Sequence, residues 1–163
     1  MARNAAINER MKREKARRMD EILLAARTLM LAKSYTGATM DEIAAEAGIT
    51  KPTIYQYFRT KDELIVALVE PLVLSLATEL ESIRKSVEIG SYASGGEIIA
   101  DVFKVYYGTF ERDPDLFRLF IIFLQVGLGR EMSAEAAGRI KELGRRCFDE
   151  GNRITVLSIQ KGY

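Results

Sequence analysis

The stretch TMDEIAAEAGITKPTIYQYFRTKDEL, residues 39–64, decides the fold because it contains three helix starts in close succession. Thr39, with Glu42 three positions later, has the spacing of a capping box and predicts that a helix begins here. Gly48 lies where the last turn of such a helix needs a left-handed residue. The first of the short helices is therefore predicted to end just before Gly48.

A second helix is predicted to follow at once, with Thr50 as its cap. Ile54 and Phe58 are separated by one helical turn and are predicted to face the interior. Thr60 and Glu63 repeat the capping-box spacing, which predicts that a third helix begins directly afterwards.

Two short helices joined by a tight turn that contains glycine form the helix-turn-helix pattern, which we assign to residues 39–58. In this motif the second helix enters the major groove of duplex DNA and contacts base edges. Lysine suits guanine or phosphate, glutamine suits adenine, and hydroxyl groups suit phosphate oxygens. A helix N-terminus adds N–H groups that bind phosphate. The predicted DNA-binding residues are Thr39, Thr50, Lys51, Thr53, Tyr55, Gln56, Tyr57 and Lys61.

The rest of the chain also shows helical spacing, and no alternating apolar pattern persists long enough to predict a strand. An all-α protein is therefore predicted. A basic segment, residues 10–18, leads into the first helix, and Pro71 is expected to kink a long one. The helices outside the motif are expected at about 16–33, 61–87, 97–112, from 114 to a break at 127–129, and from 134 to 160.

Charge is unevenly distributed along the 163 residues, although the net charge is only +1. Residues 1–61 contain 12 Lys and Arg against 7 Asp and Glu, a balance of +5, and the remainder has a balance of −4. This asymmetry favours a polyanionic partner for the first part. Ordinary variation of charge along a chain is the other interpretation.

The sequence lacks histidine and contains one cysteine, Cys147. These two facts argue against histidine-dependent catalysis and make a metal site improbable, so neither an enzyme nor a cofactor is expected. A single thiol forms no internal disulfide, which favours the reducing cytoplasm. We expect Cys147 to be a packed side chain. Neither a secretory signal nor a membrane span is expected, since charges interrupt residues 22–32 and the apolar run 119–126 is short.

The string Gly48-Ile-Thr-Lys-x-Thr-Ile-Tyr-x-Tyr-Phe-x-x-Lys61-x-x-Leu64 resembles the DNA-binding domain of the TetR family of bacterial repressors. The resemblance covers residues 16–76. Its usual DNA-contacting positions correspond here to Thr50, Lys51, Thr53, Tyr55, Tyr57 and Lys61. Gln56 occupies a variable position that could help to select the operator, and Pro52 stands where many members have glycine or alanine.

The resemblance further implies that residues 77–163 form a helical domain for ligand binding and dimerisation. Aromatic residues there could line an apolar pocket for a small-molecule effector, although ordinary core packing is the more common explanation for any one of them. The candidates are Phe103, Tyr106, Tyr107, Phe110, Phe117, Phe120 and Phe123.

Members of the family usually continue with two more helices that form the dimer interface, whereas this sequence stops at Tyr163. We therefore expect a C-terminally truncated chain. The function implied is that of a homodimeric repressor, released from a palindromic double-stranded operator by a small apolar or aromatic ligand. The alternative is a helical protein-interaction module without DNA binding. The effector, the operator and the choice between repression and activation are not encoded in any recognisable pattern.

Overall fold

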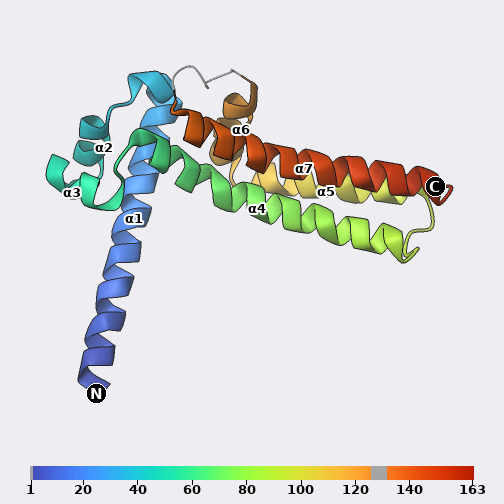
Figure 1. Cartoon of the computed structure of the whole chain (residues 1–163), viewed down its shortest axis with the longest axis horizontal. Coiled ribbons are helices and arrows are strands. Elements are labelled where there is room, and N and C mark those ends of the chain that lie inside the picture. The colour runs from blue at the N-terminus through green and yellow to red at the C-terminus, as the bar shows by residue number, and fades with distance from the viewer. Residues whose placement is uncertain (1, 126–131) are drawn as a thin grey trace. The chain divides into compact units, whose positions relative to one another are not determined.

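A computed structural model describes the backbone of residues 2–125 and 132–163, and the side chains of residues 6–122 and 132–163. Within those ranges the chain is all-helical, which confirms the predicted fold class (Figure 1). The helices are α1 (Ala2–Gly37), α2 (Met40–Glu46), α3 (Lys51–Tyr57), α4 (Lys61–Glu88), α5 (Gly95–Arg112), α6 (Pro114–Gln125) and α7 (Ala134–Gln160).

The chain divides into two compact units, Met1–Ala67 and Leu68–Tyr163. The division falls inside α4, so that the first turns of this helix belong to the first unit and the remainder to the second. Pro71 lies within α4, which continues through it as one helix. Since proline has no N–H, the carbonyl of Ala67 lacks its usual helical partner at this point.

Helix α1 is longer than the sequence predicted, because it begins at Ala2 rather than near residue 16. Its later turns bury Ile22, Ala26 and Met30 in the core of the first unit, whereas residues 6–17 are exposed. The predicted break is confirmed at Ser34, whose φ of 66° and ψ of 171° are not helical.

The predicted capping box at the start of α2 is confirmed in both directions. The Thr39 hydroxyl accepts a hydrogen bond from the Glu42 N–H at 3.2 Å, and the Glu42 carboxylate accepts one from the Thr39 N–H at 3.0 Å. Gly48 then adopts the predicted left-handed conformation, with φ of 65°. These features place α3 only a few residues after α2.

Thr50 occupies the predicted cap position of α3, but the prediction that its side chain caps the helix is wrong. Pro52 has no N–H to offer, and the Thr53 N–H donates to the backbone carbonyl of Thr50 at 2.9 Å. The Thr50 hydroxyl instead lies 2.8 Å from the Thr53 hydroxyl.

The second capping box, at the start of α4, is half confirmed. The Thr60 hydroxyl accepts a hydrogen bond from the Glu63 N–H at 3.1 Å. The Glu63 carboxylate accepts from the N–H of Arg59 at 2.7 Å, one residue earlier than the motif predicts.

In the second unit, α4 packs beside α5 and α7 (Figure 1). Arg84 of α4 pairs with Glu150 of α7 at 2.9 Å, and Arg112 of α5 pairs with Glu79 of α4 at 2.7 Å. Cys147 is buried, as predicted, and its thiol donates to the Val73 carbonyl with an S···O distance of 3.6 Å. Burial raises the pKa of this thiol to about 11.

Side chains cap three helices of the second unit, and α5 begins at Gly95, two residues before its expected start. Ser94 caps α5 by accepting from the Glu97 N–H, Asp113 caps α6 by accepting from the Leu116 N–H, and Ser133 caps α7. Over the described ranges, none of the helices is both long and apolar enough to cross a membrane. The same residues contain no cluster of three or more acidic or cysteine side chains placed to hold a metal ion.

Candidate nucleic-acid interface

Helix α3 has one buried side and one exposed side. Ile54 is 0% exposed and Phe58 is 5% exposed, so both lie in the core of the first unit as predicted. On the other side Tyr55 is 42% exposed, and Lys51 and Gln56 are also exposed. The burial of two side chains one turn apart fixes which polar side chains face outward.

Lys51 lies at the first turn of α3 and pairs with Asp41 of α2, with an Nζ···O distance of 2.8 Å. This hydrogen bond raises the pKa of Lys51, so its ammonium group stays charged at neutral pH. Both side chains are more than half exposed, and such a pair contributes little to stability. The cation is therefore available to exchange its carboxylate partner for a phosphate oxygen or a base.

Thr39, at the start of α2, has an exposed side chain whose hydroxyl is engaged in the capping box and also donates to Glu42 at 3.0 Å. Lys33 contacts the same carboxylate at 2.7 Å. Hydrogen bonds from Lys33 first, and then from Thr39, lower the pKa of Glu42 to about 2. Because these bonds occupy the Thr39 hydroxyl, a phosphate contact here would use the N–H groups at the start of α2.

Lys61 differs from the other predicted DNA-binding residues because it is half-buried. Its ammonium group donates to the carbonyl oxygens of Tyr35 at 2.5 Å and Ala38 at 2.8 Å. It also lies 4.3 Å from the centroid of the Tyr35 ring. These contacts tie the start of α4 to the residues that follow the break in α1. A DNA contact by Lys61 remains a prediction.

The remaining predicted residues of α3 divide by exposure. Thr50 is exposed and Thr53 half-buried, and their hydroxyls bond to each other. Gln56 is exposed and Tyr57 is half-buried. The structure thus gathers the predicted set on and around α3, with Lys51, Tyr55 and Gln56 as its most accessible members.

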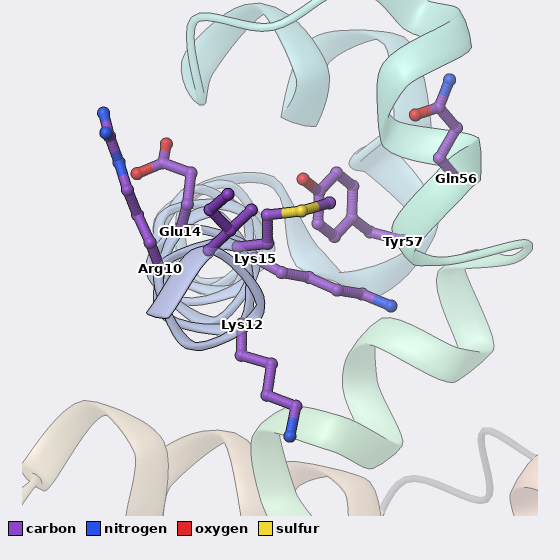
Figure 2. Close-up of a pocket in the computed structure, with 8 residues that line it drawn as sticks. Arg10, Lys12, Glu14, Lys15, Gln56 and Tyr57 are labelled. Carbon is purple, nitrogen blue, oxygen red and sulfur yellow. The ribbon is translucent and has the colours of Figure 1, made fainter. Parts of the chain in front are cut away.

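Gln56 and Tyr57 also line an open groove of about 750 Å³ between α3 and the N-terminal part of α1 (Figure 2). Sequence reasoning noticed the basic segment 10–18 but did not place it next to α3. No local pattern could have done so, because the placement depends on how α1 packs against the motif. The α1 residues that line this groove are Ile7, Arg10, Met11, Lys12, Glu14 and Lys15.

The aromatic pocket candidates lie mainly on the surface of the second unit. Phe103, Tyr107 and Phe110 are 64%, 48% and 42% exposed along α5. Phe103 stacks on Tyr107 with centroids 5.7 Å apart, and Phe110 meets the half-buried Phe117 edge-on at 5.9 Å. We call these four residues the aromatic row.

The other three candidates lie apart from the row. Tyr106 is half-buried, and burial raises the pKa of its phenol. Phe120 is 3% exposed and belongs to the core. Phe123 lies outside the residues whose side chains are described. A ligand pocket formed by the whole set stays a prediction.

Comparison with known families identifies the motif. Residues 22–68 match the model of bacterial regulatory proteins of the tetR family. Residues 22–68 therefore form a DNA-binding domain of the TetR family. The match covers the later turns of α1, all of α2 and α3, and the first turns of α4. The family consists of transcriptional regulators rather than enzymes, in agreement with the prediction from composition.

Two curated relatives from Mycolicibacterium smegmatis match the same part of the chain. The HTH-type transcriptional activator FasR is 39% identical over 61 residues, which are 37% of this chain and 28% of FasR. The HTH-type transcriptional regulator EthR is 36% identical over 52 residues, which are 32% of this chain and 24% of EthR. The chain thus spans less than a third of the length of each of these relatives in the aligned regions.

Solved structures show the same fold over most of the chain. The TetR family regulator PfmR from Thermus thermophilus has a TM-score of 0.69 and 20% identity, covering 86% of this chain and 71% of PfmR. SmeT, solved as a complex with triclosan, has a TM-score of 0.66 and 22% identity, covering 89% of this chain and 67% of SmeT.

Proposed function

We propose that this protein is a transcriptional repressor that binds a palindromic DNA operator as a homodimer and leaves it when a small apolar or aromatic ligand binds. The observation that carries the proposal is the exposed side of α3. Lys51, Tyr55 and Gln56 project from a short helix whose opposite side is fixed in the core by Ile54 and Phe58.

Each exposed side chain of α3 has a defined use on duplex DNA. Lys51 supplies a cation for phosphate or for the acceptor atoms of guanine, and Tyr55 supplies a hydroxyl for a phosphate oxygen. Gln56 can form two hydrogen bonds with adenine. Phosphate contacts set the position of the helix, and Gln56 is the residue we propose to read sequence.

A homodimer would place two copies of α3 in successive major grooves about 34–36 Å apart. Exposed apolar side chains on α7 support self-association, because Phe148 and Ile159 are 74% and 71% exposed. Large apolar side chains that are left in water favour a partner surface.

A small effector in the second unit would act by favouring a subunit arrangement that cannot span two half-sites. The aromatic row offers flat apolar surface of the kind that aromatic ligands contact. The triclosan bound to SmeT, a protein of the same fold, agrees with an effector of this class. We also propose that the protein works in the cytoplasm, where operator DNA is accessible.

Activation of transcription is a second candidate role, because FasR is named as an activator. Repression and activation use the same DNA-binding surface and differ in where the operator lies relative to a promoter. A reporter gene driven by the bound sequence separates the two roles. Deleting the gene that encodes the protein raises expression of the reporter if the protein represses, and lowers expression if the protein activates.

The test begins with selection of bound oligonucleotides from a random duplex library, followed by titration of the selected duplex. Lys51→Ala should weaken binding by about tenfold or more, since such contacts are worth about 1–3 kcal/mol. Lys141→Ala, at an exposed lysine of the second unit, is the matched control and should bind normally.

Two outcomes would contradict the DNA-binding proposal. No duplex is selected above background, or Lys51→Glu binds the selected duplex as well as the unaltered protein. Either result would favour the protein-interaction module considered as the alternative. Mass spectrometry of small molecules that remain bound after purification tests the effector, and a candidate must release the selected duplex when it is added back.

A further inference from the structure

The N-terminal part of α1 has no evident role in the core of the first unit. Residues 6–17 are all exposed, and the first fully buried side chain of the helix is Ile22. A helix of about 16 residues before Arg18 is about 24 Å long. Helices in proteins are stabilised mainly by packing, so we expect a long exposed helical segment to bind a partner.

This segment is strongly basic. Residues 2–18 include seven Lys and Arg against two glutamates, Glu9 and Glu14. Both glutamates pair with arginines of the same helix. Glu9 pairs with Arg13 at 3.9 Å, and Glu14 pairs with Arg17 at 2.5 Å.

Lys12 and Lys15, the two lysines of this segment, take no part in these pairs. They are separated by three residues and therefore project from neighbouring positions on one face. Among the side chains that the structure describes, no carboxylate lies within 4.0 Å of either ammonium group. The two lysines are thus exposed cations in a segment whose acidic groups are already paired.

The groove described above places these cations beside α3. Lys12 and Lys15 line it from α1, while Gln56 and Tyr57 line it from α3. Figure 2 shows Lys15 extending toward the side on which Tyr57 lies, whereas Arg10 extends away from α3. All these residues belong to the first unit.

We propose that Lys12 and Lys15 hold the sugar–phosphate backbone of duplex DNA next to the site where α3 enters the major groove. This inference rests on the proposed DNA binding and adds a second contact region to it. Phosphates are the partner that the charge pattern fits, and a strand that passes α3 is the nearest source of them. Backbone contacts raise affinity and salt dependence without selecting sequence.

The experiment compares two double variants that lose the same charge from the same helix. Lys12→Gln with Lys15→Gln removes the unpaired cations, and Arg13→Gln with Arg17→Gln removes paired ones. Binding of the full chain to a random-sequence duplex is titrated at several salt concentrations. Circular dichroism checks that each variant keeps its helix content, which glutamine favours.

The unpaired-lysine variant should reduce the magnitude of the slope of log K against log salt by about 1.8, since each phosphate contact contributes about 0.9 to that slope. The paired-arginine variant should leave the slope nearly unchanged. Lys12→Arg with Lys15→Arg keeps both charges and should restore the slope of the unaltered protein.

The outcomes separate this inference from the proposed function. If the unaltered protein binds neither random nor selected duplexes, both fail. If it binds and the lysine variant keeps the full slope, or both variants lose equally, only this inference is overturned. It is also overturned if the lysine variant weakens binding only to vesicles of phosphatidylcholine and phosphatidylserine, since the segment would then bind a membrane surface.

Hydroxyl-radical footprinting of the unaltered protein on a selected duplex gives an independent measurement that needs no variant. Protection of backbone beyond the positions that α3 covers supports the inference. Protection confined to those positions contradicts it.

Discussion

The starts of α3 and α4 carry the same two residues, Thr50-Lys51 and Thr60-Lys61, and use them differently. Thr60 caps its helix through its hydroxyl, whereas Thr50 does not. Lys51 is exposed and pairs with Asp41, whereas Lys61 is half-buried against two backbone carbonyls.

The difference arises from what surrounds each dipeptide. Pro52 removes an N–H from the first turn of α3, so the Thr50 hydroxyl turns to Thr53. At the start of α4, the carbonyl oxygens of Tyr35 and Ala38 lie within reach of Lys61 and accept hydrogen bonds from its ammonium group. Lys51 thus lies on the predicted DNA-binding surface, whereas Lys61 links the start of α4 to the residues after the break in α1.

The largest effect should come from replacing the two lysines separately by methionine, which nearly keeps the length of the side chain and removes its charge. Lys61→Met should lower the free energy of unfolding by about 2 kcal/mol, because two carbonyls lose a charged donor. Lys51→Met should leave it nearly unchanged, because an exposed ion pair contributes little to stability. Urea unfolding followed by circular dichroism measures both, and equal losses would refute the distinction.

The two threonines should differ by a smaller amount. Thr60→Ala should cost about 1 kcal/mol of stability, as expected for the loss of a side-chain cap. Thr50→Ala should cost only a few tenths of this, since its hydroxyl makes no cap bond. The same unfolding measurement applies, and a Thr50 cost as large as that of Thr60 would show that Thr50 caps α3 in solution.

The smallest effect concerns pH, because Glu42 is partly exposed and solvent screens its interactions. Its pKa is lowered to about 2 in the folded chain, so folding favours the ionised carboxylate. The stabilisation is present above the ordinary pKa of 4.5 and is lost as pH falls toward 2.

Glu42→Gln should therefore reduce stability near neutral pH and have a diminishing effect below pH 4.5. The measurement is the difference in urea midpoint between the variant and the unaltered chain across this range. A difference that stays constant down to pH 2 would contradict the assigned pKa. Glutamine remains compatible with the capping box, so the comparison isolates the charge.

Sequence reasoning succeeded where local chemistry determines structure. Thr39 with Glu42 and the left-handed Gly48 act within a few residues, and the burial of Ile54 and Phe58 follows from helical spacing. These residues were enough to predict the helix-turn-helix and the side of α3 that faces outward.

It failed where the structure depends on residues far apart in the chain. The burial of Lys61 depends on Tyr35 and Ala38, and no spacing rule links these positions to it. Aromatic composition likewise did not distinguish the exposed Phe103 from the buried Phe120. The start of α1 at Ala2 was missed because residues 2–15 lack an apolar face that would reveal a helix.

The buried Cys147 has a practical consequence for chemical labelling. It is the sole thiol of the sequence, it lies under the surface of the second unit, and its raised pKa keeps it protonated at neutral pH. Thiol-directed reagents attack the exposed thiolate, so the natural chain should react slowly. A cysteine introduced on the surface would then accept a fluorophore or spin label selectively, without prior removal of Cys147.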